Sequence, residues 1–282
     1  MVDTLVSVDW LRDQLNDPNL IVLDASYHLP AARRDPDAEF VEQHIPGALR
    51  FDIDEISDPS VALPHTLPTP EQFDKAMQAL GIGAGMQIVV YDSVGLFSAA
   101  RAWWMFRYFG HEEVAVLDGG LPAWVEAGQT VEPGRGRVAP PPHPFRSRVN
   151  RHWVVDAEDL VENIQSEEYL VLDARANPRF TGEAAEPRPG TRAGHIPGSI
   201  NLPFSDLLDP ESGRFKSAEA VRALFSDVGV NHLPVVVSCG SGVTACVLAL
   251  GLEVAGLPEP KLYDGSWSEW GSRDDLPVQT GN

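Results

Sequence analysis

Cys239 opens a glycine-rich stretch whose residue types suit nucleophilic chemistry. The stretch from Cys239 to Ala245 reads Cys-Gly-Ser-Gly-Val-Thr-Ala, and the apolar run 234–237 before it is typical of a buried strand. The apolar segment 243–255 after it predicts a helix that ends at Gly256. A cysteine between a strand and a helix start lies among backbone N–H groups and at the positive end of the helix, and both favour the thiolate. The flanking glycines therefore favour a nucleophile over a core cysteine beside a tight turn.

The chain repeats itself at a nearly constant spacing. The four matching pairs of segments are 20–25 with 169–174, 44–48 with 195–199, 88–92 with 235–239, and 118–124 with 264–270. The offsets stay between 146 and 151 residues and keep the same order. We infer a duplicated domain, with halves at 1–132 and 152–282. The segment 133–151 has the proline and glycine content of a linker.

The duplication provides an internal control for the cysteine. Asp92 stands in the first copy where Cys239 stands in the second. We therefore expect the second half to carry the chemistry and the first half to be inactive.

Within each copy, short apolar strands alternate with helical patterns. In the first copy the strands are expected at 21–23, 88–91 and 114–117, and the helices at 71–80 and 99–109. This alternation predicts an α/β fold in which two tandem domains each have a parallel sheet flanked by helices. Ligands of such sheets gather at the carboxyl ends of the strands, where Cys239 falls.

Composition narrows the partners and the compartment. A net charge of −20 argues against nucleic acid and anionic membranes as partners. The two cysteines do not make a disulfide framework, and no apolar run is long enough for a membrane span, so we expect a cytoplasmic protein. The eight histidines have no metal-ligand spacing, and we expect neither a metal nor another cofactor.

The duplicated unit, its two His-Ile-Pro-Gly motifs and the Cys-Gly-Ser-Gly-Val-Thr loop resemble the two-domain rhodanese-family sulfurtransferases. The resemblance runs from about Val6 to Trp270 and implies that Cys239 carries a sulfane sulfur as a persulfide. An inactive first copy is also a trait of that family. The loop is most similar to the branch that takes sulfur from 3-mercaptopyruvate. The loop residues expected at the substrate are Gly240, Gly242, Val243 and Thr244.

The donor can be argued from the charge of the loop. Thiosulfate-preferring relatives carry Arg and Lys after the cysteine, where this chain has Gly240 and Ser241. A mercaptopyruvate carboxylate instead needs a clamp at a distance from the sulfur. By motif, the resemblance assigns that clamp to Arg179 and Arg188, whereas we expect Arg175 and Arg192 to lie outside it. The alternative is that all four arginines balance nearby acidic residues.

Proton handling leaves two interpretations open. The expelled pyruvate enolate must be protonated, and the resemblance implies a relay of Ser241 with His44 and Asp35, both from the first copy. A serine–histidine–aspartate relay is chemically sensible because histidine donates protons near neutral pH. His195, however, occupies the same motif in the second copy, so the histidine can equally be a structural residue in both.

Three alternative functions require residues that this chain has only in part. A cysteine phosphatase needs an arginine six residues after its cysteine, and position 245 is alanine. A non-catalytic binding module is disfavoured because Cys239 is present. A thiosulfate sulfurtransferase is the closest alternative. The sequence leaves the acceptor open among thioredoxin, a small thiol, cyanide or another protein. Cys246 is expected to be a small buried core residue.

Overall fold

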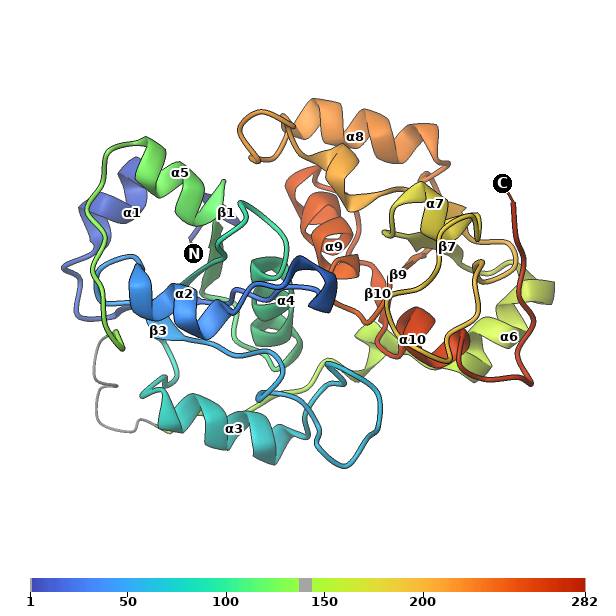
Figure 1. The fold of residues 1–282 in the computed structure, drawn as a ribbon, viewed down its shortest axis with the longest axis horizontal. Helices are drawn as coiled ribbons and strands as arrows, with labels where there is room; N and C mark the ends of the chain where they lie inside the picture. The colour runs from blue at the N-terminus through green and yellow to red at the C-terminus, as the bar shows by residue number, and fades with distance from the viewer. Residues whose placement is uncertain (1, 137–143, 282) are drawn as a thin grey trace. The chain divides into compact units, whose positions relative to one another are not determined.

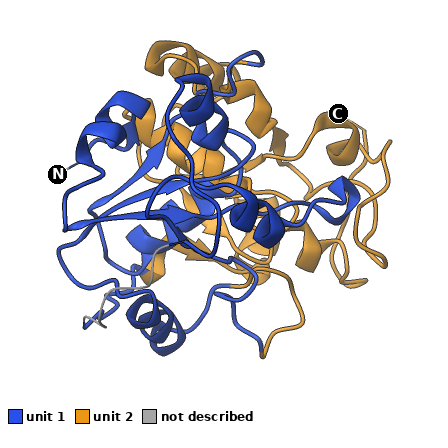
Figure 2. Cartoon of the chain, turned by 60° about the vertical axis from the view of Figure 1, so that its left-hand side comes forward, with its two compact units in different colours: residues 1–59, 67–150, 210–214 blue, residues 60–66, 151–209, 215–282 orange. Residues whose placement is uncertain are grey.

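A computed structural model of the chain describes residues 2–136 and 144–281, which form two compact units (Figure 2). Unit 1 comprises residues 1–59, 67–150 and 210–214, and unit 2 comprises residues 60–66, 151–209 and 215–282. Most of each predicted half thus falls in one unit, and the short segments 60–66 and 210–214 belong to the unit built mainly from the other half. Part of the predicted linker 133–151, residues 137–143, lies outside the described residues.

The sheet of unit 1 has five parallel strands in the order β1-β5-β4-β2-β3. The strands are β1 (Leu5–Val6), β2 (Leu20–Asp24), β3 (Leu49–Arg50), β4 (Gln87–Tyr91) and β5 (Val114–Leu117). Five pairs from Leu20↔Gln87 to Asp24↔Tyr91 fix the register of β2 against β4. All five residues of β2 are buried, as expected for a parallel strand covered on both faces.

Unit 2 repeats the same topology. Its strands are β6 (Val154–Val155), β7 (Leu170–Asp173), β8 (Ile200–Asn201), β9 (Val235–Ser238) and β10 (Lys261–Tyr263), in the order β6-β10-β9-β7-β8. The pair Asp173↔Ser238 in β7 and β9 matches Asp24↔Tyr91 in β2 and β4. The identical strand order confirms the fold predicted from the repeated motifs.

Helices flank each sheet (Figure 1). Those of unit 1 are α1 (Val8–Gln14), η1 (Pro30–Ala32), α2 (Pro36–Glu42), α3 (Pro70–Ala79), α4 (Ala99–Tyr108) and α5 (Gly120–Glu126). Those of unit 2 are η2 (Arg151–Trp153), α6 (Ala157–Ser166), α7 (Asn177–Phe180), η3 (Phe204–Leu207), α8 (Ala218–Asp227), α9 (Ala245–Val254) and α10 (Ser266–Trp270). Within the described ranges, no helix is both long and apolar enough to cross a membrane.

Local sequence explains where several helices begin. Thr69 and Gln72 form a reciprocal capping box at the start of α3, and Pro70 occupies the first helical position. Asp156 and Asp159 cap α6 in the same way. Helix α9 begins at Ala245, two residues later than its apolar pattern predicts, because residues 239–244 form a loop.

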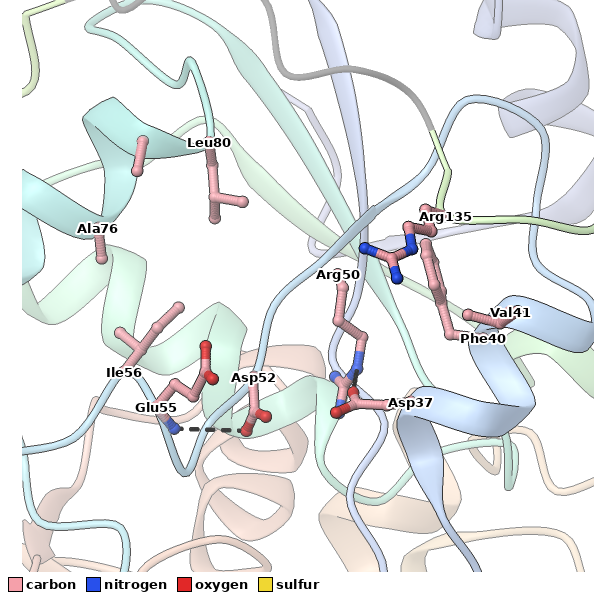
Figure 3. A pocket seen from close by; sticks show the side chains of 11 residues that line it. Asp37, Phe40, Val41, Arg50, Asp52, Glu55, Ile56, Ala76, Leu80 and Arg135 are labelled. Atoms are coloured by element: carbon pink, nitrogen blue, oxygen red, sulfur yellow. Dashed lines mark hydrogen bonds and ion pairs between the residues drawn. The ribbon is translucent and has the colours of Figure 1, made fainter.

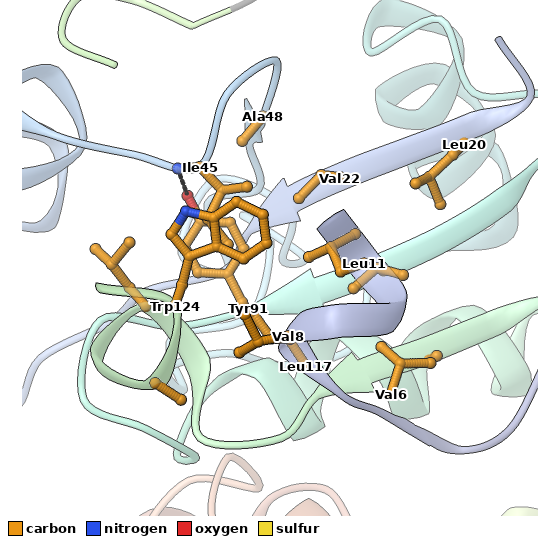
Figure 4. Close-up of a cluster of buried hydrophobic side chains, with 14 of the residues drawn as sticks. Val6, Val8, Leu11, Leu20, Val22, Ile45, Ala48, Tyr91, Leu117 and Trp124 are labelled. Carbon is orange, nitrogen blue, oxygen red and sulfur yellow. Dashed lines mark hydrogen bonds between the residues drawn. The ribbon is translucent and has the colours of Figure 1, made fainter. Parts of the chain in front are cut away.

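Each unit has its own apolar core. In unit 1, Leu11, Val22 and Trp124 pack with Tyr91, whose hydroxyl accepts a hydrogen bond from the backbone N–H of Ile45 (Figure 4). In unit 2, a corresponding cluster contains Trp267 and Trp270. The two cores fix the sheets and therefore the loops at the carboxyl ends of their strands.

Candidate active site

Cys239 directly follows β9, the central strand of the unit 2 sheet, so its loop lies at the carboxyl edge of that sheet. The residue is 1% exposed and its thiol is free. Helix α9 begins at Ala245, after the loop has turned. The strand-to-helix placement predicted from the sequence is confirmed.

The first residues of α10 fasten this loop. Ser266 Oγ accepts hydrogen bonds from the backbone N–H of Cys239 (3.2 Å) and of Gly242 (3.0 Å), and it donates to Tyr263 O (2.9 Å). The backbone N–H of Trp267 donates to Cys239 O at 3.0 Å, and that of Ser268 donates to Gly240 O at 2.8 Å. Hydrogen bonds therefore hold both the backbone N–H and the backbone carbonyl of Cys239.

Ser266 has a backbone conformation that favours glycine. Its φ is +50°, in the left-handed region. The matching residue of unit 1 is Gly120, with φ +57°. A serine at 266 stores backbone strain, and its hydroxyl is what fastens the loop.

Other backbone N–H groups of the loop remain available to a ligand. In the part of the chain that the structure describes, Gly240, Ser241, Val243 and Thr244 have no hydrogen-bond acceptor for their N–H groups. These donors belong to the five residues that follow Cys239. They can stabilise a thiolate or persulfide by hydrogen bonding.

The hydroxyl of Ser241 has a histidine partner that the sequence analysis missed. His65 Nδ1 lies 2.9 Å from Ser241 Oγ, and the two residues are 4% and 5% exposed. His65 belongs to the 60–66 segment of unit 2. The sequence does distinguish His65 from the repeated histidines. His44 recurs as His195, whereas His65 has no counterpart in the second copy, and a residue that only one copy has is a better candidate for a role that only one copy performs.

His44 and His195 have the same surroundings. His44 Nδ1 lies 2.8 Å from Phe40 O and its ring stacks on Phe40; His195 Nδ1 lies 2.9 Å from Phe180 O and its ring stacks on Phe180. Burial lowers the pKa of His195, which favours a neutral ring. These contacts agree with the interpretation that the repeated histidine is a structural residue in both copies.

Asp35 caps a helix. Its carboxylate accepts hydrogen bonds from the backbone N–H of Asp37 (3.0 Å) and Ala38 (3.1 Å) at the start of α2. The residue is exposed. These contacts give Asp35 a structural task, and the structure provides His65, in place of His44, as the partner of Ser241.

Two of the four arginines near Asp173 hold the fold. Arg175 is 2% exposed, pairs with Asp173 and Glu186, and lies 4.5 Å from the ring centroid of Trp267. Among the described residues, the guanidinium of Arg192 donates only to backbone carbonyls, those of Trp270, Gly271, Arg273 and Leu276. These contacts agree with the prediction that Arg175 and Arg192 lie outside the substrate clamp.

Arg179 lies against the loop. Its Nη2 would be 3.0 Å from a Cβ built on Gly240, and its guanidinium pairs with Glu186 at 2.6 Å. Arg188 is half-buried and has no ion pair among residues 2–136 and 144–281. Arg179 thus lies beside the loop, and Arg188 has no carboxylate partner within the described part of the chain.

The corresponding loop of unit 1 carries its own anion. Asp92 is 0% exposed, and its carboxylate accepts hydrogen bonds from the backbone N–H of Val94 (3.1 Å), Phe97 (2.7 Å) and Ala99 (2.9 Å). Val94 and Phe97 match Ser241 and Thr244, so at these two positions a carboxylate occupies N–H groups that unit 2 leaves available around Cys239. The loop of unit 1 thus has neither a thiol nor these two N–H groups to offer a ligand, which agrees with the expectation that the first copy is inactive.

Two parallel α/β units with a cysteine loop in only one of them define a tandem rhodanese-type protein. The rhodanese-like domain family matches residues 7–127 and 156–273, and the chain belongs to that family.

Named relatives cover nearly the whole chain. It is 42% identical to thiosulfate/3-mercaptopyruvate sulfurtransferase 1, mitochondrial, of Arabidopsis thaliana, over 99% of this chain and 78% of that protein. It is 45% identical to human 3-mercaptopyruvate sulfurtransferase, over 94% of this chain and 91% of that protein. The crystal structure of SseA from Escherichia coli, described as having the rhodanese fold of 3-mercaptopyruvate sulfotransferases, matches with a TM-score of 0.85 and 40% identity. That match covers 95% of this chain and 100% of that chain.

Proposed function

We propose that this chain is a sulfurtransferase that takes sulfur from 3-mercaptopyruvate onto Cys239 and passes it to a thiol acceptor. The observation that carries the proposal is the Cys239 loop, which Ser266 fastens and in which four backbone N–H groups have no acceptor among the described residues. The names of the relatives support the donor.

The first half-reaction balances without a cofactor. The Cys239 thiolate attacks the sulfur of mercaptopyruvate, a new S–S bond forms, and the C–S bond breaks. The electron pair of that bond leaves as the enolate of pyruvate, which takes up one proton at carbon. Cys239 is left as a persulfide, whose charge the loop N–H groups stabilise.

Ser241 and His65 are the groups we assign to that proton. The Ser241 hydroxyl lies two residues from the nucleophile, and His65 can supply it with a proton across the 2.9 Å contact. Histidine suits this role because its protonation changes near neutral pH. His65 takes the role that the sequence analysis had given to His44.

Arg179 and Arg188 are the proposed carboxylate clamp. Arg179 is already oriented by Glu186 beside Gly240, so it reaches the substrate side of the loop without losing its own partner. Its planar guanidinium suits a carboxylate. Arg188 supplies a second charge.

In the second half-reaction, an acceptor thiolate attacks the outer sulfur of the persulfide. The S–S bond breaks, the sulfur moves to the acceptor, and Cys239 returns as a thiolate. Thioredoxin, another protein thiol, a small thiol or cyanide can each accept sulfur in this way. A reducing compartment such as the cytoplasm keeps both Cys239 and such acceptors in the thiol form.

Thiosulfate is the alternative donor, and one of the relatives carries both donors in its name. The uncharged residues Gly240 and Ser241 favour mercaptopyruvate, because the thiosulfate dianion gains more from positive side chains at those positions.

The test is kcat/KM for each donor with cyanide as acceptor. We expect mercaptopyruvate to be preferred, with Cys239→Ser inactive and Cys246→Ala, the matched cysteine control, active. A preference for thiosulfate would overturn the donor assignment, and turnover by Cys239→Ser would overturn the mechanism.

A further inference from the structure

The carbonyl of Gly240, inside the Cys239 loop, is held by two donors of one residue. The backbone N–H of Ser268 donates to Gly240 O at 2.8 Å, and the Ser268 hydroxyl donates to the same oxygen at 2.5 Å. Ser268 is 7% exposed and lies in the first turn of α10, where backbone N–H groups have no partner within the helix. The sulfur-transfer steps described above assign no role to Ser268.

These two bonds fix the direction of the N–H group of Ser241. The carbonyl of Gly240 and the N–H of Ser241 belong to one planar trans peptide group, so they point in opposite directions. Because the carbonyl points at α10, the Ser241 N–H points away from α10. The preceding peptide group is arranged in the same way, since the Trp267 N–H donates to Cys239 O at 3.0 Å. The N–H groups of Gly240 and Ser241, which have no acceptor among the described residues, are therefore both turned away from α10.

The first copy provides a control for this arrangement. In the alignment of the two copies, Pro122 occupies the position of Ser268, and Ser93 occupies that of Gly240. Pro122 and Ser268 are each the third residue of their helix, where proline is tolerated. Proline has neither an N–H nor a hydroxyl to donate, and Ser93 O accepts no hydrogen bond within the described ranges. The pair of bonds to the loop carbonyl is thus found in the copy that has the cysteine and is missing from the copy that lacks it.

The loop of unit 1 orients the same N–H group by other means. The N–H of Val94, which matches Ser241, donates to the Asp92 carboxylate at 3.1 Å. That carboxylate is present at all times, whereas the sulfur of Cys239 carries charge only as a thiolate or a persulfide. In unit 2 the N–H must therefore be oriented before the charge appears, and a donor oriented in advance costs no reorganisation when the charge develops.

We propose that Ser268 is a positioning residue, which keeps the N–H of Ser241 available to the sulfur of Cys239 by holding the carbonyl of Gly240. The inference rests on the proposed sulfur transfer, because the thiolate and the persulfide are the anions that this N–H would stabilise. Without the two bonds, the peptide group between residues 240 and 241 can rotate and present its carbonyl oxygen, which repels an anion, in place of the N–H. A glycine at 240 makes this rotation sterically easier.

The test compares Ser268 variants of the full-length protein that also carry Cys246→Ala, so that Cys239 is the single thiol. Ser268→Ala removes the hydroxyl and keeps the amide donor, and the first turnover with mercaptopyruvate, measured as pyruvate release, should slow roughly fivefold. Ser268→Pro reproduces the first copy and removes both donors, so the loss should reach roughly a hundredfold. Ser268→Thr keeps both donors and should stay close to the parent.

Two readouts separate positioning from a merely structural role. The ultraviolet absorbance of the Cys239 thiolate, followed against pH, should appear at higher pH in Ser268→Ala and at higher pH still in Ser268→Pro, because each variant stabilises the anion less. KM for mercaptopyruvate should stay near the parental value, since Arg179 is held by Glu186 and not by the loop.

Two control variants remove contacts that do not involve the loop. Ser272→Ala removes a serine hydroxyl that donates to the backbone carbonyl of Glu269 in α10 at 2.8 Å. Phe40→Leu loosens the core of unit 1, where the Phe40 ring stacks on His44 and lies on α2 beside Val41 (Figure 3). Phe40→Leu should lower Tm, and neither control should move the thiolate profile or slow the first turnover.

A parental first turnover and thiolate profile in Ser268→Ala would overturn the proposal. An equal loss in Ser268→Thr, or the same shift of the thiolate profile in Phe40→Leu, would overturn it as well. If Ser268→Pro does not fold, the comparison of Ser268→Ala with Ser268→Thr decides. The thiolate profile needs no sulfur donor, so absence of mercaptopyruvate turnover in the parent would refute the proposed function and leave the role of Ser268 to be decided by that profile.

Discussion

Ser266 is predicted to hold the Cys239 loop in its reactive conformation, at the cost of a strained backbone. Two substitutions separate these effects. Ser266→Ala removes the hydroxyl but keeps a Cβ at φ +50°, whereas Ser266→Gly removes the hydroxyl and relieves the strain.

The magnitudes follow from the contacts. The hydroxyl makes three hydrogen bonds of 3.2 Å or less, two accepted from the Cys239 and Gly242 amides and one donated to Tyr263 O, while a fourth, accepted from Ser238 Oγ at 3.5 Å, is long enough to add little. At about 1 kcal/mol net for each bond, Ser266→Ala should lower the free energy of unfolding by about 3 kcal/mol. Ser266→Gly loses the same bonds but regains about 1 kcal/mol, since the left-handed conformation costs a residue with a Cβ about 1–2 kcal/mol and glycine adds entropy to the unfolded chain.

Urea unfolding of the full-length chain, followed by the loss of far-ultraviolet circular dichroism, measures these differences. The expected order of stability is parent, then Ser266→Gly, then Ser266→Ala. Both variants should also transfer sulfur more slowly than the parent, because the Cys239 and Gly242 amides lose their acceptor. Equal stability of the parent and Ser266→Ala, or parental activity in both variants, would refute the reasoning.

Three further predictions concern neighbouring residues. His65→Gln should lower kcat for mercaptopyruvate by about tenfold to a hundredfold and flatten the pH profile of kcat, whereas His44→Gln should lower Tm and leave that profile unchanged; the opposite pattern would restore His44 as the proton donor. Gly240→Ala should raise KM for mercaptopyruvate because its methyl group would lie 3.0 Å from Arg179 Nη2 and displace the guanidinium, and Arg179→Ala should raise KM by roughly tenfold to a hundredfold. Unchanged KM in both would remove Arg179 from the substrate site. Cys246→Ala should keep parental turnover and peroxide sensitivity, since Cys246 is fully buried with its thiol directed at Gly242 O, and a Cys239–Cys246 crosslink found by mass spectrometry in folded protein would contradict this.

Periodicity and repetition were enough to predict the fold and the strand-to-helix position of the Cys239 loop. The strand before Cys239 is a run of β-branched residues, and its partner in the first copy has the same pattern, so the sheet and the position of the loop followed from local sequence. Helix α3 begins at Pro70 and α4 at Ala99, within one residue of the predicted starts.

The residues proposed to transfer the proton were harder to predict because they depend on contacts between distant parts of the chain. His65 and Ser241 are 176 residues apart, and no local pattern links them. His44 lay in a conspicuous motif, but that motif recurs at His195 because both copies need the same packed ring. The role of Ser266 in holding the Cys239 loop was equally hard to predict, since it depends on a positive φ that sequence patterns do not reveal.

The most direct test of the central claim is a single turnover with mercaptopyruvate and no acceptor, followed by mass spectrometry of the intact protein and its peptides. We predict one pyruvate released per chain and a mass increase of one sulfur atom on the peptide that contains Cys239, removed by a later addition of thiol. Pyruvate release without added sulfur at Cys239, or sulfur carried at Cys246, would contradict the account.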